Sequence, residues 1–520
     1  MREPRELDAI VVGGGVNGLV AALVLRRSGL SVRVIEGKPA VGGMTRAEFP
    51  FPRAPKLPAQ AGAHRIGILS PELMRLLGVS IPTRPRDPCI FAPSTRARAF
   101  LAGAGNAAFR AAAQSIAPRD GAALERFHAE LDAIVADLAP AWTSGPMGIE
   151  ETADRYLRPA LRDPFLALAR GSAVAAFDRA GIESELLRAI LAADALSGTW
   201  AGPFDPGSAT PLLLRHLARS TEGGCEAIPD GGLAAVVRVL SEAALAAGVE
   251  IETGRDVVEI VVEGAAVAGV RFADGNTLAA ETVLASADPS RLVAMVGADK
   301  LTPEYIARID GFTKRGSIAK VNLALVALPK FAALPDDHGQ YRAVTHLLPD
   351  ADGAPLAALA RAFAEADRGV LPAAPPIECT FPTTDSEGRV SVSMVVGWTP
   401  YDLQGSTWAA EEEKFTARVI AALDAFAPGA ASLVVDVSVL HPKKLETHFG
   451  VTRGHPYHID DAFLFGERLP YTTPMGGLYA CGASCAPAGA VFGAAGYNAA
   501  MRVLADLEMA LESTDVTHIV

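Results

Sequence analysis

The sequence is poor in cysteine, and its few cysteines are not arranged for a disulfide framework or a zinc site. The 520 residues include only Cys89, Cys225, Cys379, Cys481 and Cys485. An odd and scattered set of this kind is typical of reduced thiols in a cytosolic protein. Three residues separate Cys481 from Cys485, whereas redox and zinc pairs usually have two between them. We therefore interpret the cysteines as structural, expect no metal site and predict a cytoplasmic location.

The sequence also lacks an excess of basic residues. Lys and Arg number 47 against 59 Asp and Glu, which gives a net charge of −12 at pH 7. This balance argues against a nucleic-acid partner, because phosphates require a basic face. With 50% hydrophobic and 20% charged residues the chain is not mainly disordered. Its length exceeds one ordinary core, so we expect two closely connected domains.

Uninterrupted apolar segments of membrane-spanning quality are missing as well. Residues 9–25 and 469–501 are uncharged, but four glycines and an asparagine lie in the first run. Pro474, Pro487 and many glycines interrupt the second run. Neither run suits a hydrocarbon core. We predict no spanning segment, while a peripheral membrane contact and the oligomeric state remain open.

The first uncharged run carries a dinucleotide-binding pattern. A β-branched strand at residues 8–12 leads directly into Gly13-Gly-Gly-Val-Asn-Gly18, and a helix follows to Arg27. A second strand, residues 30–35, ends at Glu36. The order of strand, glycine turn, helix, strand and acid is typical of a site for a dinucleotide.

Each position in this turn has a predicted role. Gly13 permits the tight turn, and Gly15 lets the backbone approach the pyrophosphate. Gly18 allows helix and strand to pack closely, while Val16 and Asn17 offer N–H groups at the helix start. Glu36 is placed to accept hydrogen bonds from the adenosine ribose, and its charge would repel the 2′-phosphate of NADP.

A second glycine-rich segment, Gly103-Ala-Gly-Asn-Ala-Ala108, competes for the same interpretation. No β-branched strand leads into it, so we interpret it as the start of a helix rather than as a second nucleotide site.

The rest of the chain divides into helical and strand-rich parts. Residues 105–214 read as helices, with breaks at 119–121 and 204–207. From Val249 the pattern changes to short strands at 250–251, 257–262, 267–272 and 282–285, with a hairpin turn at Asp274-Gly275. Later strands are predicted at 317–328, 389–398 and 433–440.

Two segments separate FAD from NAD and carry a family resemblance. The loop Gly37-Lys-Pro-Ala-Val-Gly-Gly-Met-Thr-Arg46 resembles the extension that runs towards the flavin in the superfamily of amine oxidases and phytoene desaturases. The tail, Gly477-Leu-Tyr-Ala-Cys-Gly-Ala-Ser484 followed by residues 485–500, is similar to the closing flavin-binding motif of phytoene desaturase-type proteins. Within them it resembles the branch of pyridine nucleotide-disulphide oxidoreductase domain-containing protein 2. Further matches, such as Gly223 to Leu233, Lys320 to Ala324 and Phe449 to His458, span nearly the whole chain.

The resemblance implies an α/β protein with FAD as cofactor. It implies a Rossmann-like FAD domain of the glutathione reductase type, assembled from residues 1–100, 222–295 and 465–520. Residues 101–221 and 296–464 would form an α+β substrate domain with an antiparallel sheet and a helical cap. The residues it places at the cofactor, in addition to the glycine turn and Glu36, are Gly37, Gly42, Gly43, Met44, Thr45, Val257, Gly482, Ser484, Val491, Phe492 and Gly493.

The tail departs from its relatives at two points. Relatives carry a His-Pro-Gly-Gly-Gly run and a Gly-Arg-Asn, where this chain has Ala486-Pro-Ala-Gly-Ala490 and Gly496-Tyr-Asn498. Ala488 and Ala490 still permit close approach, unless the glycines of the family need a positive φ.

Few catalytic side chains are expected, because a flavin accepts hydride itself. His458 matches a histidine of the family segment and can act as an acid or base near neutral pH. Lys320 shares its strand face with Ile318 and Asn322, a face that looks either into a flavin-side cavity or into water. It is a candidate base or flavin-polarising charge, with a structural lysine as the alternative. His64 and Tyr497 carry less weight.

We therefore predict an FAD-dependent oxidoreductase that dehydrogenates a largely apolar small molecule by hydride transfer to flavin N5. One dinucleotide site implies reoxidation by dioxygen or a quinone. Two alternatives remain: a flavin-dependent isomerase or amine oxidase, and a flavin-binding regulatory protein without turnover.

Overall fold

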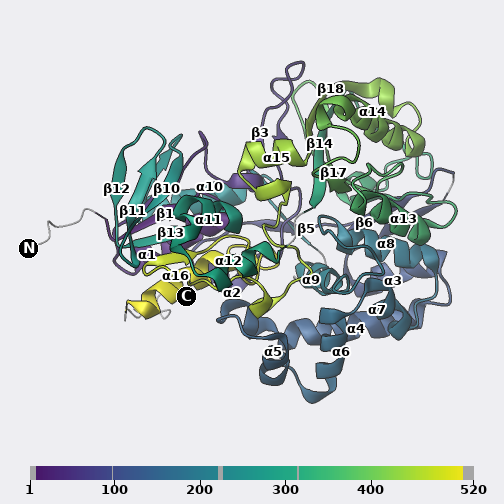
Figure 1. Ribbon diagram of the computed structural model, residues 1–520. Helices are drawn as coiled ribbons and strands as arrows, with labels where there is room; N and C mark the ends of the chain where they lie inside the picture. Colours follow the sequence, from purple (N-terminus) through teal and green to yellow (C-terminus); the bar gives the residue numbers. More distant parts are fainter. Residues whose placement is uncertain (1–6, 97, 221–225, 313–314, 508–520) are drawn as a thin grey trace, which may run out of the picture.

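A parallel sheet and a larger, mostly antiparallel sheet organise the molecule (Figure 1). The computed structural model describes residues 7–96, 98–220, 226–312 and 315–507. Cys225 and the first residues of the predicted motif at 223–233 lie outside the described residues.

The parallel sheet joins strands from distant parts of the chain. In spatial order they are β19 (Leu478–Ala480), β13 (Thr282–Ala285), β1 (Ala9–Val12), β2 (Val32–Glu36) and β9 (Glu250–Thr253). Every residue of β19, β13 and β1 is buried, as expected when helices cover a parallel sheet, whereas the edge strand β9 is only partly buried. Helix α1 (Val16–Arg27) packs against α10 (Leu233–Ala246) and α16 (Ala494–Asp506). Both uncharged runs thus divide into a buried strand, a loop and a helix.

A small antiparallel sheet lies beside the parallel one, at the left of Figure 1. It consists of β10 (Val257–Glu263), β11 (Ala266–Phe272) and β12 (Thr277–Ala279). The turn at Asp274-Gly275 connects β11 to β12, as predicted, and Gly275 has the positive φ of 88° that such a turn requires.

The larger sheet lies on the other side of the molecule from the small antiparallel sheet (Figure 1). Its strands, in spatial order, are β18 (Val434–Leu440), β14 (Gly316–Leu325), β17 (Val390–Pro400), β16 (Ile377–Thr384), β15 (Val344–Leu347), β6 (Ile90–Pro93) and β7 (Ala99–Ala102). All neighbours are antiparallel except β15 and β6. The sequence predicted β14, β17 and β18 but not the other four. Strand β6 belongs to this sheet although residues 90–93 fall within the predicted FAD segment 1–100.

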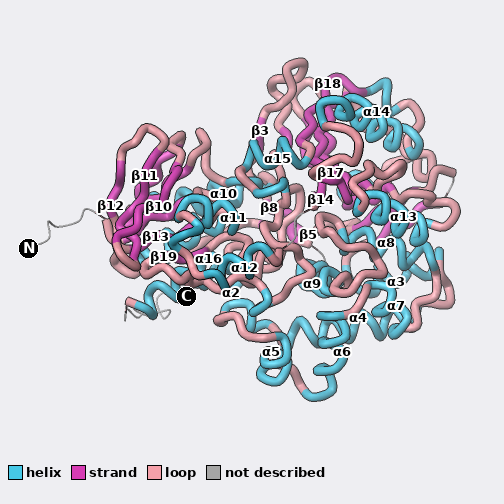
Figure 2. The backbone as a smooth tube through the Cα atoms, in the orientation of Figure 1, coloured by secondary structure: helices cyan, strands magenta, loops and turns pink. Residues whose placement is uncertain are grey.

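Helices fill the lower right of the molecule in Figures 1 and 2. They are α3 (Gly105–Ile116), α4 (Gly121–Asp137), α5 (Ile149–Tyr156), α6 (Pro159–Arg170), α7 (Ala173–Ala180), α8 (Glu185–Leu196) and α9 (Thr210–Arg219). The predicted helical region and its two breaks are confirmed. Gly105 opens α3, so the second glycine-rich segment is a helix start, as predicted.

The remaining elements connect these units. The helices are α2 (Pro71–Leu76), α11 (Pro289–Val296), α12 (Pro303–Asp310), α13 (Pro355–Asp367), α14 (Trp408–Phe426) and α15 (Pro442–Phe449). Two short strand pairs are β3 (Ala47–Glu48) with β4 (Ala59–Gln60), and β5 (Thr83–Pro85) with β8 (Ala227–Pro229). The chain is therefore a mixed α/β protein, as predicted. Among the described residues, no helix has both the length and the apolar character that a membrane crossing requires.

Candidate active site

A cavity of about 530 Å³ lies between the parallel sheet and the larger sheet. Residues after β1 line one part of it, and Ile318, Glu378 and Val395 of the larger sheet line another. The predicted site residues that line it are Gly13, Gly15, Val16, Asn17, Glu36, Gly37, Gly42, Gly43, Met44, Thr45, Val257, His458, Phe492 and Gly493. Gly18, Lys320, Gly482, Ser484 and Val491 are predicted site residues that do not line it.

The glycine turn presents an uncapped helix start to this cavity. Gly15 is the N-cap of α1, receives no side-chain hydrogen bond, and no acidic residue lies in the first turn. Gly13 has a φ of 102°, and a Cβ added at Gly15 would meet only Ser286 Oγ at 4.0 Å. Free N–H groups and the helix dipole make this end attractive to an anion such as phosphate.

Gly18 serves the turn itself. A Cβ at this position would lie 2.0 Å from the Gly13 carbonyl oxygen and 3.3 Å from Val11. The close approach is therefore chiefly between helix α1 and its own preceding turn, and secondarily between the helix and strand β1.

Glu36 is fixed at the end of β2. One carboxylate oxygen accepts a hydrogen bond from Gly14 N and the other from Lys38 N, both at 2.8 Å. The two bonds hold the acid against the cavity wall, where it was predicted to face a ribose.

The extension loop is tied to the glycine turn. Gly42 N donates to Gly14 O at 2.8 Å, and Gly42 and Gly43 have φ values of 113° and 54°. These conformations favour glycine. The loop then continues as a short 3₁₀ turn, Gly43–Thr45, along the cavity.

The tail supplies a second uncapped helix start. Gly493, with a φ of 85°, is the N-cap of α16, which likewise has no side-chain cap and no acid in its first turn. Phe492 and Gly493 line the cavity, whereas Val491 bridges to Ile68 and lines a separate cavity. Gly482 and Ser484 lie behind the lining residue Ala483, so their predicted contact with a pyrophosphate stays a prediction.

A buried charge cluster adjoins the cavity through His64, Arg65 and Glu378, and the sequence did not predict it. We use this name for three arginines, three carboxylates and two histidines: Arg65, Arg86, Arg219, Asp194, Glu226, Glu378, His64 and His346. Arg65 donates through Nη1 to Asp194 Oδ1 at 2.9 Å and to Glu378 Oε2 at 2.8 Å. It also pairs with Glu226. Burial alone would raise the pKa of Glu378, but the Arg65 guanidinium and the hydrogen bond from His64 hold it well below its usual range.

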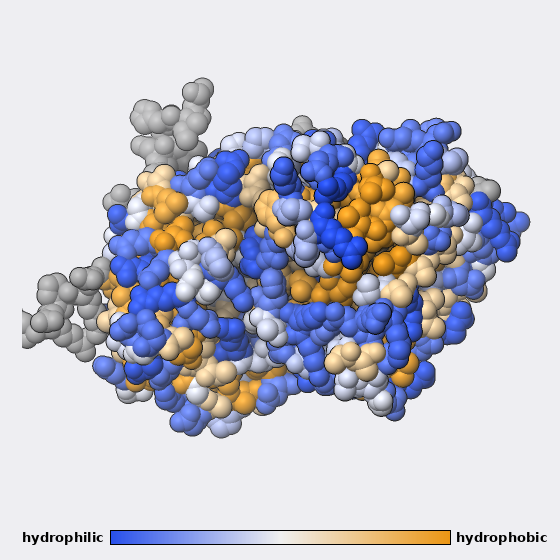
Figure 3. Space-filling model, turned by 90° about the horizontal axis from the view of Figure 1, so that it is seen from above, coloured by the Kyte–Doolittle hydropathy of each residue, from blue (hydrophilic) through white to orange (hydrophobic). Residues whose placement is uncertain are grey.

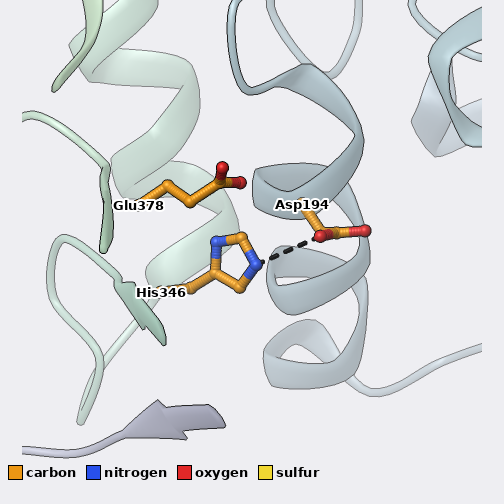
Figure 4. A group of neighbouring side chains, drawn as sticks. All are labelled: Asp194, His346 and Glu378. Carbon is orange, nitrogen blue, oxygen red and sulfur yellow. Dashed lines mark hydrogen bonds and ion pairs between the residues drawn. The ribbon is translucent and has the colours of Figure 1, made fainter. Parts of the chain in front are cut away.

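Asp194, His346 and Glu378 also have a geometry that a metal ion can use (Figure 4). One ligand atom of each lies within 4.8 Å of the others. The carboxylates, however, already accept from Arg65 and Arg219, and His346 Nε2 contacts Asp194 Oδ1 at 3.2 Å. The two guanidinium groups already occupy oxygens of these carboxylates, and their positive charges oppose the binding of a metal cation. We therefore interpret the group as an ion-pair network.

Lys320 lies directly behind His64. Its Nζ contacts Ser393 Oγ at 2.5 Å and His64 Nδ1 at 3.3 Å, and the lysine is fully buried. It therefore faces neither water nor the cavity directly. Burial lowers the pKa of Lys320 to about 7, against the attraction of Glu378.

His64 connects Lys320 to the cavity. Its Nε2 contacts Glu378 Oε1 at 2.6 Å, and its ring lines the cavity. Burial and the neighbouring Lys320 lower the pKa of His64 to about 4, so the imidazole is neutral at pH 7. The structure thus gives His64 a more central position than the sequence did.

His458 lines the cavity with an unusual backbone conformation. Its φ is 60°, and its N–H donates to His455 O at 3.2 Å. A left-handed conformation at a residue other than glycine costs free energy and is often found at functional sites. His455 is buried against Asp460, at 3.3 Å, and is a structural residue.

Comparisons with known proteins place this site in a family. The sequence matches the family described as flavin containing amine oxidoreductase over residues 17–504. The chain belongs to this family, and it is an FAD-dependent oxidoreductase.

Individual relatives cover almost the whole chain. Pyridine nucleotide-disulfide oxidoreductase domain-containing protein 2 of mouse is 29% identical, over 97% of this chain and 94% of the relative. One of the subunits of limonene dehydrogenase from Castellaniella defragrans is 22% identical, over 100% and 98% of the two chains. A putrescine oxidase triple mutant has a similar fold, with 17% identity, a TM-score of 0.60 and coverage of 96% and 98%.

The cavity fits FAD on its own evidence. Two uncapped helix starts, at Gly15 and Gly493, open onto one cavity, and a Cβ at Gly489 would meet nothing within 4 Å. A diphosphate requires such donors and such space. The glycine turn would hold the diphosphate, Glu36 the ribose, and the loop at 42–45 with Phe492 and Gly493 the flavin end.

Proposed function

We propose that the protein dehydrogenates a small molecule with a largely apolar body, and that dioxygen or a quinone then reoxidises the cofactor. One observation carries the proposal: the cavity that begins at the glycine turn continues to an apolar wall, and beside that wall His64 lines the cavity with Lys320 behind it. FAD, when bound, accepts a hydride at N5.

The apolar wall comes from the larger sheet and from α15. Ile318 and Val395 pack with Val451, and Met44 and Phe449 pack against them. All five residues line the cavity. Such a surface would hold the apolar part of a substrate by excluding water.

A proton acceptor lies next to this apolar wall, because Lys320 is two positions from Ile318 on β14 and pairs in register with Val395 on β17. Removing hydride from a C–H bond to form a double bond also releases a proton, which needs an acceptor. With a pKa near 7, Lys320 is partly neutral at neutral pH and can take up a proton, while its protonated form places a positive charge behind His64.

Relatives support dehydrogenation as the reaction. The limonene dehydrogenase relative is named for an apolar substrate, and it aligns with this chain from end to end. Amine oxidation is a second candidate, because putrescine oxidase and cyclohexylamine oxidase share the fold.

The domain division also remains part of the proposal. We propose a glutathione reductase-type FAD domain from residues 1–100, 222–295 and 465–520, and a substrate domain from 101–221 and 296–464. Supporting it, the parallel sheet takes all its strands from the first set of segments.

We also propose a cytoplasmic location, an uncharged or weakly polar substrate body, and no nucleic-acid partner. The four described cysteines are buried thiols outside any disulfide, which suits a reducing compartment. Apolar side chains gather most densely to the right of the centre of the face in Figure 3, with smaller groups elsewhere among the polar ones. A peripheral membrane contact stays a prediction.

Anaerobic mixing with candidate substrates tests the reaction. Loss of the oxidised flavin absorbance with terpenes or other alkenes, and not with amines, supports dehydrogenation. Bleaching with amines alone supports amine oxidation. A product change without bleaching supports isomerisation, and no change with any compound favours a binding protein.

The role of His458 needs its own experiment. His458→Asn keeps the left-handed backbone, because asparagine tolerates a positive φ. If His458 is catalytic, this variant retains FAD and its melting temperature but reduces the rate of flavin reduction. Unchanged reduction would show that the histidine serves the backbone turn alone.

A further inference from the structure

An arginine in the cavity wall has only neutral hydrogen-bond partners. Arg215 lies on α9 and lines the cavity. Its Nε donates to Asp194 O at 3.2 Å, and its Nη2 donates to Ser197 O at 3.1 Å. A longer contact of 3.5 Å joins Nη2 to the Tyr457 hydroxyl oxygen. Among the described residues, no carboxylate forms an ion pair with this guanidinium.

The neighbouring charges are already balanced without Arg215. In the buried charge cluster Arg65 pairs with all three carboxylates, Arg219 with Asp194, and Arg86 with Glu226. Three arginines thus meet three carboxylates. Arg215 is a fourth arginine beside them. Burial and Arg65 would lower its pKa, but Tyr457, Glu378 and Asp194 raise it above its usual value, and no carboxylate of the described residues forms a direct ion pair with its guanidinium on the cavity side.

One further acid shares the cavity with Arg215. Asp461 also lines it, but its nearest ion-pair partner is Arg468, with 3.7 Å between Nη1 and Oδ1. Burial and the neighbouring Asp460 raise the pKa of Asp461. Arg468 and, to a smaller extent, Arg215 lower this pKa, but among the described residues Asp461 forms no ion pair with Arg215.

The surroundings of Arg215 are otherwise apolar. Pro211, Leu214 and Ala218 on the same helix line the cavity, as does Ala195 on α8. A cationic group in such a setting is costly to bury unless an anion pairs with it. A guanidinium also matches the planar geometry of a carboxylate.

We infer that the substrate carries an anionic group, a carboxylate or one of similar geometry, and that Arg215 binds it. The inference rests on the proposed function for the location of the substrate, and it narrows the substrate class to an apolar body with one acidic end. Arg215 is then a specificity-determining residue, with the Tyr457 hydroxyl beside the same anion.

Matched acids and amides test this inference in the FAD-loaded protein. The probes are phenylacetate with phenylacetamide, and octanoate with octanamide, with binding followed by the change in flavin absorbance and by thermal shift. We expect at least one acid to bind about tenfold or more tightly than its amide, because a charged hydrogen-bonded pair is lost in the amide.

Two variants of Arg215 identify the group responsible. Arg215→Met removes the charge and should abolish the preference for the acid, while Arg215→Lys keeps the charge without the planar fork and should retain part of it. FAD content and melting temperature show that each variant is folded. Arg238→Gln is the control, since Arg238 is exposed and pairs only with Glu242 in its own helix.

Equal affinity for acid and amide, no binding of either acid, or a preference that survives Arg215→Met would each overturn the inference. The proposed reaction fails separately. If no compound bleaches the flavin but the acid preference holds, the anion site stands and the reaction does not. If an uncharged substrate is oxidised and no acid preference appears, the proposed reaction stands and the anion site does not.

Discussion

His64 and Glu378 meet through a 2.6 Å contact between Nε2 and Oε1, although 314 positions separate them in the chain. The contact fixes the histidine so that Nδ1 faces Lys320, at 3.3 Å. It also joins the wall of the cavity to the buried charge cluster, because the other oxygen of Glu378 accepts from Arg65. Glu378 therefore contacts both the histidine beside the proposed proton acceptor and an arginine of the buried charge cluster.

Removal of that carboxylate should destabilise the fold. Glu378→Gln leaves Arg65 with less compensation in a buried position, and we expect a loss of about 3 kcal/mol in the free energy of unfolding. Urea unfolding measures it. Glu411→Gln is the matched control, because this carboxylate lies at the surface, where its partners are Lys414 and Ser406, and the loss of its charge should change the free energy of unfolding far less. Similar losses in both variants would contradict the role given to the cluster.

Lys320→Met should stabilise the protein, and the gain should depend on pH. The pKa of Lys320 falls from 10.5 to about 7 on folding. Between these values the unfolded chain binds the extra proton, so stability rises with pH in the wild type. The gain from Lys320→Met is therefore largest at or below pH 7 and shrinks towards pH 10. Melting temperatures of both proteins across this range check the trend, and a gain independent of pH would refute it.

The same lysine should affect the flavin reaction. In the wild type we expect the rate of flavin reduction to change with pH near 7, where Lys320 changes charge. Lys320→Met should lack this change, because no other group in the His64–Lys320–Glu378 set changes charge there. Stopped-flow reduction at several pH values measures it. A transition that persists in Lys320→Met would assign it to another group.

Substitutions at two glycines of the turn should have different effects, one on FAD binding and the other on folding. In Gly15→Val the new side chain enters the space that we assign to the diphosphate and meets almost no protein atoms. The protein should therefore fold with a near-normal melting temperature but lose FAD. Gly18→Ala places a Cβ 2.0 Å from Gly13 O and should impair folding itself. Absorbance after purification reports FAD content. Cys481→Ser is the control that should keep its FAD, and retention of FAD by Gly15→Val would contradict the position of the diphosphate.

The altered tail gives a stability test. Ala488 has a φ of 58°, a conformation that costs a residue with a Cβ about 1–2 kcal/mol. Ala488→Gly relieves this cost but adds unfolded-state entropy of about 0.4–1 kcal/mol, so a net stabilisation is expected. Ala490 has no positive φ, and Ala490→Gly should destabilise the protein instead. Thermal unfolding of the two variants gives the signs, and the same sign for both would refute the strain at Ala488.

The strands that were predicted differ in composition from those that were missed. Strands β1 and β13 are buried throughout, and β2 is buried except at Arg33, so all three are recognisable as mostly β-branched and apolar runs. Strand β6 ends at Pro93, β15 contains Thr345 and His346, and β16 contains Pro382 and several polar residues. Strands interrupted by proline or polar residues carry no clear alternation. Their positions are set by the neighbours in the sheet.

The sequence by itself determined the cofactor end of the site. The glycine turn, Glu36 and the loop at 37–46 lie close together in the first part of the chain, so one local pattern of strand, turn, helix, strand and acid is enough to predict a dinucleotide site. The tertiary structure alone decided the substrate end. Arg65, Asp194, Glu226 and Glu378 come from four distant segments, and only folding brings their charges together. Burial lowers the pKa of Lys320, and in the described part of the chain folding leaves Arg215 without a direct ion pair. Both effects depend on what surrounds a side chain rather than on what precedes it in the sequence.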